Sequence, residues 1–318
     1  MEKLIYVWCC LITSFCFSQS HYPADKVTLA TETYAFLEGQ DRSLATIAIQ
    51  FPELKNDVAA IRKQTQEIQD NAKGNIRAFL ECTVGLAAFE TLQHKIDALI
   101  GGQFSPVIAQ KKHALHFLDE VRKRLQGRGA IPDLIHRTIL AFAFAEHPEK
   151  ELEQKHLVTT TIEHPAMSGV NLAFHVPESW AKTEAAMPET LVEFTSFAGT
   201  GHEKILLLAY DVGNVGPDFL APASVREMIP PHTVLVRNEP YFWGTVQGSF
   251  TETEEVYPTK DGDKKVRMLQ FMFVRDHYLY CLQGSAGPVS KNENLGPSLA
   301  KYEKLFHKVA ASLSICPK

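Results

Sequence analysis

The sequence predicts an α+β protein, in which an N-terminal α-helical bundle is followed by a mostly antiparallel β-sheet domain with packed helices. Two observations lead to this prediction. Apolar residues recur at spacings of three, four or seven up to about residue 155, and at every second position afterwards. Hairpin turn signals also separate the strand-like runs of the second half. We therefore expect a signal peptide over residues 1–20, a helical domain over 21–155 and a sheet domain over 156–318.

The first twenty residues have the layout of a secretory signal peptide. Lys3 supplies a positive start, residues 4–17 form a short apolar stretch, and Ser18 and Ser20 are small residues suited to cleavage. The stretch is shorter than the roughly 18 apolar residues of a transmembrane helix, and no such run follows. A buried N-terminal helix is the alternative interpretation. We expect an exported protein, periplasmic or extracellular, with no transmembrane segment in the mature chain.

Apolar stripes predict a series of long helices in the first half. One stripe runs from Leu54 to Leu80, a second from Leu86 to Leu99, and a third from Leu115 to Leu125. The run over residues 132–147 is apolar on nearly every side, which predicts the central helix of the bundle. The stripes indicate packing within the bundle, although a dimer formed through the longest stripe would have the same periodicity.

The second half contains alternating runs typical of strands, together with two helical segments. The strands are expected at residues 157–164, 170–176, 191–198, 204–212, 233–238, 242–257, 265–276 and 277–286. Tight turns are expected at residues 199–201, 261–262 and 276–277, and helices at 217–229 and 297–315. The last helix carries five large apolar side chains on one face, so we expect the sheet domain to unfold when it is removed.

Residues 170–180, VNLAFHVPESW, place a proline at the end of a strand and a tryptophan three residues later. This order resembles the opening strand of the PsbP-like fold, which photosystem II extrinsic proteins, Ran-binding Mog proteins and bacterial secreted proteins share. The stretches LVEFTSFAGTGHEKILLLAYDV, KKVRMLQFMFVRDHYLYCLQGSAG and KYEKLFHKVAASLSI resemble its later hairpins and closing helix. The resemblance covers about half of the chain and implies a PsbP/Mog-like α/β/α sandwich there. It also implies that Trp180 closes one end of the sandwich, with a contact role as the alternative.

Consecutive aromatic residues at 241–243 suggest a binding surface. Successive side chains of a strand point to opposite faces, so at least one of Tyr241, Phe242 and Trp243 is expected at the surface. Exposed aromatic patches often mark interaction sites. Trp180, Tyr241 and Trp243 are therefore the candidate binding residues.

The sequence contains no recognisable catalytic, phosphate-binding or dinucleotide-binding motif, so we expect no catalytic residue, cofactor or metal. His113 and His116 could face one way on a helix, but their basic neighbours favour a solvated surface. Glu252, Glu254 and Glu255 predict a solvated strand edge in preference to a calcium site.

Three cysteines follow the predicted signal peptide. Cys82 and Cys281 lie in helical and strand-like runs, which favours buried free thiols. A single disulfide among Cys82, Cys281 and Cys316 is the alternative, and the sequence does not decide between them.

The chain has 32 basic and 37 acidic side chains, so it lacks the basic excess that nucleic acid binding requires. The PsbP-like resemblance implies binding and assembly roles without a shared catalytic centre. We therefore expect an exported, non-enzymatic interaction or accessory module whose partner is another exported or envelope protein. The alternative is an extracytoplasmic hydrolase with a site in the cleft between the two halves, built on His164 or His202.

Overall fold

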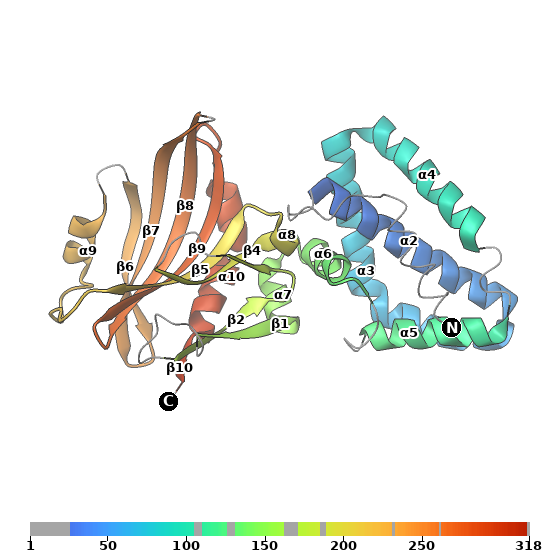
Figure 1. The fold of residues 1–318 in the computed structure, drawn as a ribbon, viewed down its shortest axis with the longest axis horizontal. Helices are drawn as coiled ribbons and strands as arrows, with labels where there is room; N and C mark the ends of the chain where they lie inside the picture. The colour runs from blue at the N-terminus through green and yellow to red at the C-terminus, as the bar shows by residue number, and fades with distance from the viewer. Residues whose placement is uncertain are drawn as a thin grey trace. The chain divides into compact units, whose positions relative to one another are not determined.

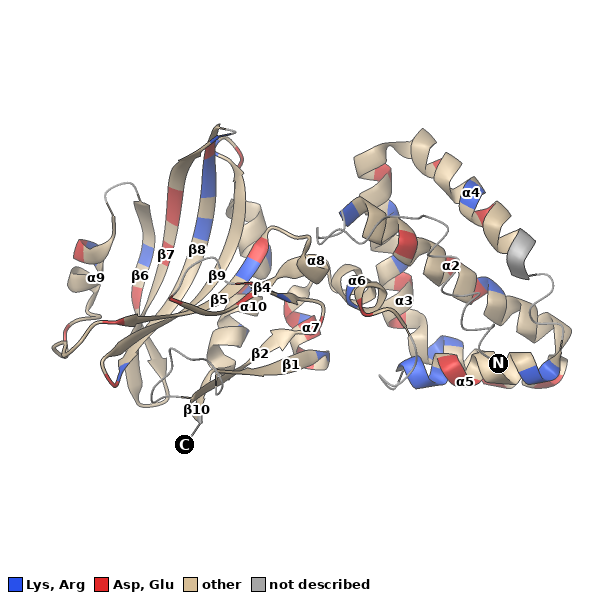
Figure 2. Ribbon diagram, viewed as in Figure 1, with Lys and Arg blue, Asp and Glu red and all other residues tan. Residues whose placement is uncertain are grey.

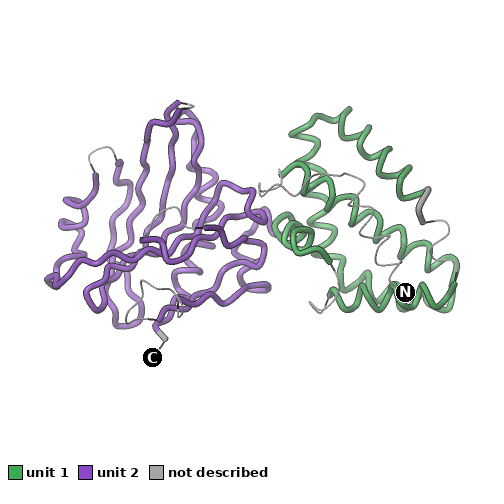
Figure 3. The backbone as a smooth tube through the Cα atoms, in the orientation of Figure 1, with its two compact units in different colours: residues 1–143 green, residues 144–318 purple. Residues whose placement is uncertain are grey.

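The computed structural model describes residues 26–104, 110–125, 131–161, 171–184, 189–230, 233–260 and 262–316. The chain divides into two compact units, residues 1–143 and residues 144–318 (Figures 1 and 3). Helices make up the described part of the first unit, and an antiparallel sheet with packed helices makes up most of the second. The predicted α+β class is confirmed. The predicted signal peptide lies outside the described residues.

The first unit is built from helices that pack around α3. In chain order they are α2 (Lys26–Gln50), a short 3-10 helix (Pro52–Leu54), α3 (Lys55–Val84), α4 (Leu86–Phe104), α5 (Lys111–Leu125) and α6 (Asp133–Ala143). Helix α3 contacts α2, α4, α5 and α6, so the prediction that residues 132–147 form the central helix was wrong. The reason is length, because the 30 residues of α3 span about 45 Å, whereas α6 has only 11 residues.

The apolar core of the first unit confirms part of the predicted stripes. Helices α2, α3 and α5 and the 3-10 helix share a buried cluster of Leu44, Ile47, Leu54, Val58, Ile61, Ala114, Leu118 and Val121. In α4 the buried line is Phe89, Ile96 and Ile100, while Leu86 and Leu99 are exposed. The predicted stripe was therefore right at Phe89 and Ile96 and wrong at its two ends, where a helix supports more than one spacing of three or four.

The second unit contains two antiparallel sheets. Its elements are α7 (Pro148–Gln154), β1 (His156–Thr160), β2 (Asn171–Pro177), β3 (Ala181–Thr183), β4 (Thr190–Thr195), α8 (Ser196–Gly199), β5 (Glu203–Asp211), α9 (Pro222–Met228), β6 (Thr233–Trp243), β7 (Val246–Thr259), β8 (Gly262–Arg275), β9 (Tyr278–Ser290), α10 (Gly296–Ser312) and β10 (Ser314–Cys316). Among the described residues, the large sheet has the order β3-β4-β5-β9-β8-β7-β6 and the small sheet the order β1-β2-β10.

The turns between the strands confirm some sequence predictions and correct others. Asp276 and His277 join β8 to β9 with positive φ angles of 49° and 70°, the left-handed backbone of a two-residue hairpin. The predicted strand 242–257 is instead two strands, because the chain reverses at Gly244, whose φ is 60°. The predicted strand 191–198 ends at Thr195, because Phe197 and Ala198 have left-handed backbones with φ angles of 48° and 54°.

Helix α10 covers one face of the large sheet, which we call the inner face. Its side chains Leu299, Tyr302, Phe306 and Val309 are buried there, as the predicted apolar face requires. The sheet comes so close to Phe306 that a Cβ atom at Gly284 would lie 2.2 Å from its ring. Helix α7 packs against α10 and belongs to the second unit. The boundary between the two units therefore lies between residues 143 and 144, before the point near residue 155 where the apolar spacing changes from helical to strand-like.

Candidate functional site

The aromatic run at the end of β6 divides between the two faces of the sheet. The ring of Tyr241 lies 5.1 Å from Phe271, and that of Trp243 lies 5.0 Å from Phe273, so both belong to the inner face. Phe242 points the other way and is 62% exposed. The exposed aromatic residue of the run is therefore Phe242, which the sequence did not distinguish from its neighbours.

Trp180 lies within the core of the second unit. Only 2% of its surface is exposed, and its ring meets Tyr302 and Phe306 edge-on at 6.2 and 6.4 Å. Both partners come from α10, so the tryptophan fastens the end of β2 to that helix. This position leaves its side chain no surface for a partner.

Phe242 is part of an apolar area on the outer face of the sheet, the face opposite α10. Register aligns Pro240, Ser249, Met272, Cys281 and Leu208 in one row across β6, β7, β8, β9 and β5. The next row on this face, two residues closer to the β8–β9 turn, includes Val274, Leu279 and Tyr210. On β6, Phe242 lies two residues after Pro240 and therefore on the same face. We call Tyr210, Pro240, Phe242, Met272, Val274 and Leu279 the outer apolar patch.

The outer apolar patch is accessible and uncharged. Phe242, Pro240 and Tyr210 are exposed, and the other three members are half-buried. In the row of Met272, Leu208 and Cys281 form a small buried cluster with Leu206, and Met272 packs against it. Aromatic residues and methionine without charges are the composition typical of the centre of protein–protein interfaces.

The acidic run on β7 is part of a buried ion-pair network, so the prediction of a solvated edge was wrong. Strand β7 pairs with both β6 and β8, and the side chain of Glu252 is only 4% exposed. Its carboxylate accepts hydrogen bonds from Arg237 on β6 and, at 2.7 Å, from Arg267 on β8. Arg237 also donates to Glu303 of α10 at 2.7 Å. Figure 2 shows the acidic positions of β7 between basic positions of β6 and β8.

The cysteines occupy different environments. Cys281 is a buried free thiol, as predicted, and burial raises its pKa to about 12. Cys82 is also free but exposed, so its predicted burial was wrong. It lies in the last turn of α3, beyond Leu80, the last buried residue of that helix. Cys316 ends β10, and its side chain lies outside the described part of the structure.

The histidines do not assemble into a site within the described part of the chain. His113 is half-buried and His116 is exposed, three residues apart on α5. His164 lies outside the described residues, and His202 is exposed. No group of three or more His, Cys, Asp or Glu side chains that could hold a metal ion occurs in the described ranges. Nor does any described helix combine the length and apolar character needed to cross a membrane.

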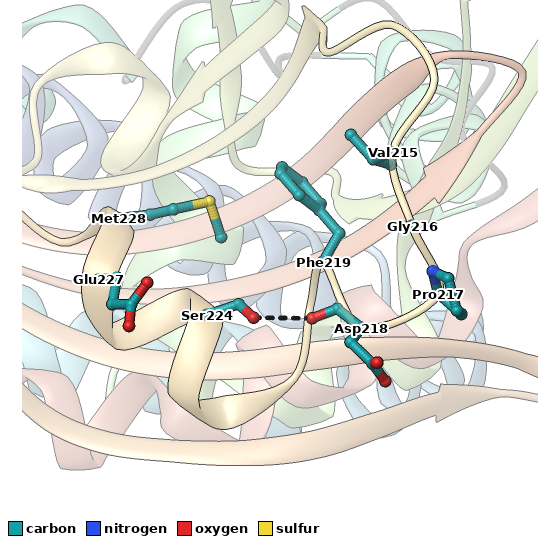
Figure 4. Close-up of a pocket in the computed structure, with 8 residues that line it drawn as sticks. All are labelled: Val215, Gly216, Pro217, Asp218, Phe219, Ser224, Glu227 and Met228. Carbon is teal, nitrogen blue, oxygen red and sulfur yellow. Dashed lines mark hydrogen bonds between the residues drawn. The ribbon is translucent and has the colours of Figure 1, made fainter.

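The described part of the second unit contains several hollows, three of which are relevant to a functional site. One, of about 400 Å³, lies between the loop after β5 and α9; Val215, Phe219 and Met228 line it together with the exposed carboxylates of Asp218 and Glu227 (Figure 4). There the Ser224 hydroxyl donates to the Asp218 carbonyl at 2.8 Å, which closes the turn into α9. The second hollow is a charged groove between α7 and α10. The third is an apolar recess of about 210 Å³ beside Trp243.

No protein-family model and no curated protein sequence matches the chain. Solved structures similar to it include a Bacteroides thetaiotaomicron protein, 13% identical with a TM-score of 0.29, where the match spans 46% of each chain. LpqN of Mycobacterium tuberculosis, described as involved in cell envelope biogenesis, is 12% identical, with a TM-score of 0.33 over 53% of this chain and 95% of its own. The Ran-binding protein Mog1p of Saccharomyces cerevisiae is 9% identical, with a TM-score of 0.33 over 51% and 95%. A Mog protein is thus among the similar structures, as the sequence resemblance predicted for half of the chain.

Proposed function

We propose that the protein is an exported, non-enzymatic accessory module that binds another exported or envelope protein through the outer apolar patch. The observation that carries the proposal is Phe242, a large aromatic side chain that is 62% exposed at the end of an edge strand of the large sheet. An aromatic side chain in that position keeps a large apolar area in water, which is removed when a partner covers it.

The surroundings of Phe242 support the same interpretation. The patch spreads over β5, β6, β8 and β9, with the polar side chains of Gln247 and Ser249 on β7 between its β6 and β8 members. The backbone hydrogen bonds of the sheet fix its shape before any partner arrives. A rigid surface loses little conformational entropy on binding, which favours affinity. The export part of the proposal rests on the positive and apolar N-terminal sequence alone.

Site-specific photo-crosslinking tests the proposal. A photoreactive phenylalanine analogue is placed at Phe242 in one variant and at Val234 in another, because both side chains are 62% exposed and both belong to β6. Val234 is opposite Glu254, on the other face of the sheet. We expect a discrete adduct from position 242 in the exported fraction and none from position 234.

A second variant links the adduct to the patch. Changing Leu279 to aspartate puts a charge in the patch between Tyr210 and Val274, and we expect it to abolish the adduct formed from position 242. Equal adducts from positions 242 and 234, or no adduct from position 242 in cells that export the protein, would contradict the proposal.

A further inference from the structure

The apolar recess beside Trp243 is distinct from the outer apolar patch, because it opens on the inner side of the β6–β7 turn. It is lined by Trp243, Gly244, Val246, Phe273, Ala311, Leu313 and Ile315. None of these side chains carries a charge, and the one polar atom among them is the indole nitrogen of Trp243. A cavity of about 150 Å³ with a similar lining stays dry and binds benzene, so about 210 Å³ has room for a larger apolar group.

The tryptophan that forms one wall is held on several sides. Its indole nitrogen donates to the carbonyl of Ala310 at 2.9 Å, which leaves only carbon atoms facing the recess. Its ring lies 4.6 Å from the ring of Tyr241 and rests over Gly248, where a Cβ atom would come within 2.8 Å of it. The wall is therefore rigid without a ligand.

The wall formed by Leu313 is held by the same carbonyl oxygen of Ala310. The backbone N–H of Leu313 also donates to the Ala310 carbonyl, at 3.1 Å, so one oxygen at the end of α10 fixes both walls. Strand β10 then holds Ile315 by pairing with β2. A site whose walls are fixed by hydrogen bonds and a sheet keeps its shape when empty, which is the usual property of a ligand pocket.

The recess has a closed end and an open end. Phe273 and Leu313 are buried at 1% and 8% exposure, whereas Gly244 and Ala311 are exposed. A ligand with a polar end can therefore place its hydrocarbon part against Phe273 and leave the polar end in water. A polar group at the closed end would lose its hydrogen bonds to water and find no replacement among the lining side chains.

We propose that this recess binds the short alkyl chain of an amphiphile, with the polar head at the Gly244 and Ala311 end. The volume is below the roughly 300–1,000 Å³ of pockets for drug-sized molecules, so the ligand part inside it is small. Each added methylene contributes about 0.8 kcal/mol on burial, which corresponds to about a fourfold gain in affinity.

Titration with linear alcohols, followed by the indole N–H signal of Trp243 in NMR spectra of the full chain, tests the proposal. We expect saturable shifts whose dissociation constant falls about fourfold for each methylene from 1-butanol to 1-hexanol. We expect 1,6-hexanediol, which would bury a second hydroxyl, to bind at least about tenfold more weakly than 1-hexanol.

Two variants close the recess in different ways. Val246→Phe fills it from the β7 side, and Ala311→Phe blocks its open end from an exposed position on α10, which keeps the test valid if the first variant folds poorly. We expect either variant to abolish the saturable shift, and the control Phe242→Ala, on the outer face, to leave the dissociation constant within about twofold. Non-saturable shifts, equal binding of the diol, or undiminished binding by a folded recess variant would overturn the proposal.

Discussion

The strongest stability prediction concerns Glu252, the buried centre of the ion-pair network. Replacing it with glutamine removes the negative charge but keeps one oxygen acceptor of nearly the same shape. Hydrogen bonds to charged groups contribute about 1.5–3 kcal/mol each, and Glu252 accepts them from Arg237 and Arg267. If the remaining oxygen keeps about half of that contribution, the free energy of unfolding falls by roughly 1.5–3 kcal/mol. The loss stays below the roughly 3–5 kcal/mol of a fully orphaned buried charge, because Arg237 keeps Glu303 and both arginines reach solvent.

Urea unfolding followed by tryptophan fluorescence measures this loss. Trp180 and Trp243 both belong to the second unit, and the third tryptophan, Trp8, falls in the predicted signal peptide. The fluorescence of the mature protein therefore reports the unit that contains Glu252. For a slope of about 2–3 kcal/mol per molar urea, the midpoint falls by about 1 M. The matched control is Glu254→Gln, two residues along the same face, whose nearest basic nitrogens are 3.9 and 4.0 Å away. We expect less than about 1 kcal/mol there, and equal midpoints for the two variants would refute the reasoning.

Three further predictions follow from individual side chains. Trp180→Ala removes a fully packed ring and is expected to lower the free energy of unfolding by about 3–5 kcal/mol in the same assay, whereas an unchanged midpoint would contradict the core position. Burial and the neighbouring His156 ring, stacked 4.3 Å away, lower the pKa of His175. The unfolded chain then binds the proton more readily, so we expect stability to fall as the pH drops through about 6.5 and to level off below the pKa of the folded state. An NMR pH titration should also show the pKa of His175 rising in His156→Gln. In maleimide labelling with peptide mapping at pH 8, the exposed Cys82 should react in the native protein and Cys281 only after unfolding.

The sequence was most informative where a residue type leaves the backbone few choices. The helical repeat identified α3 and α10, because large apolar side chains at every third or fourth position have to be buried together. The Asp276–His277 reversal was also predictable, since short polar side chains tolerate the left-handed backbone that a two-residue hairpin needs.

The sequence was least informative where strand register decides a residue's surroundings. Glu252 was predicted to be solvated because its charge is visible in the sequence, whereas Arg237 and Arg267 lie beside it only through pairing of three strands. The outer apolar patch could not be predicted for the same reason, since Tyr210 and Phe242 are far apart in the chain. A usable signal did exist: Tyr210, Val274 and Leu279 alternate with core residues in their predicted strands. It becomes meaningful only when neighbouring strands are aligned.

The small sheet of the second unit joins its beginning to its end. Strand β2 lies between β1, which precedes it in the chain, and β10, at residues 314–316. Strand β10 is therefore synthesised long after β2, and until β10 is available β2 has one edge unpaired. Folding of the small sheet is then complete only after β10 has been made, and a chain interrupted before β10 exposes that edge of β2 to pairing with other molecules.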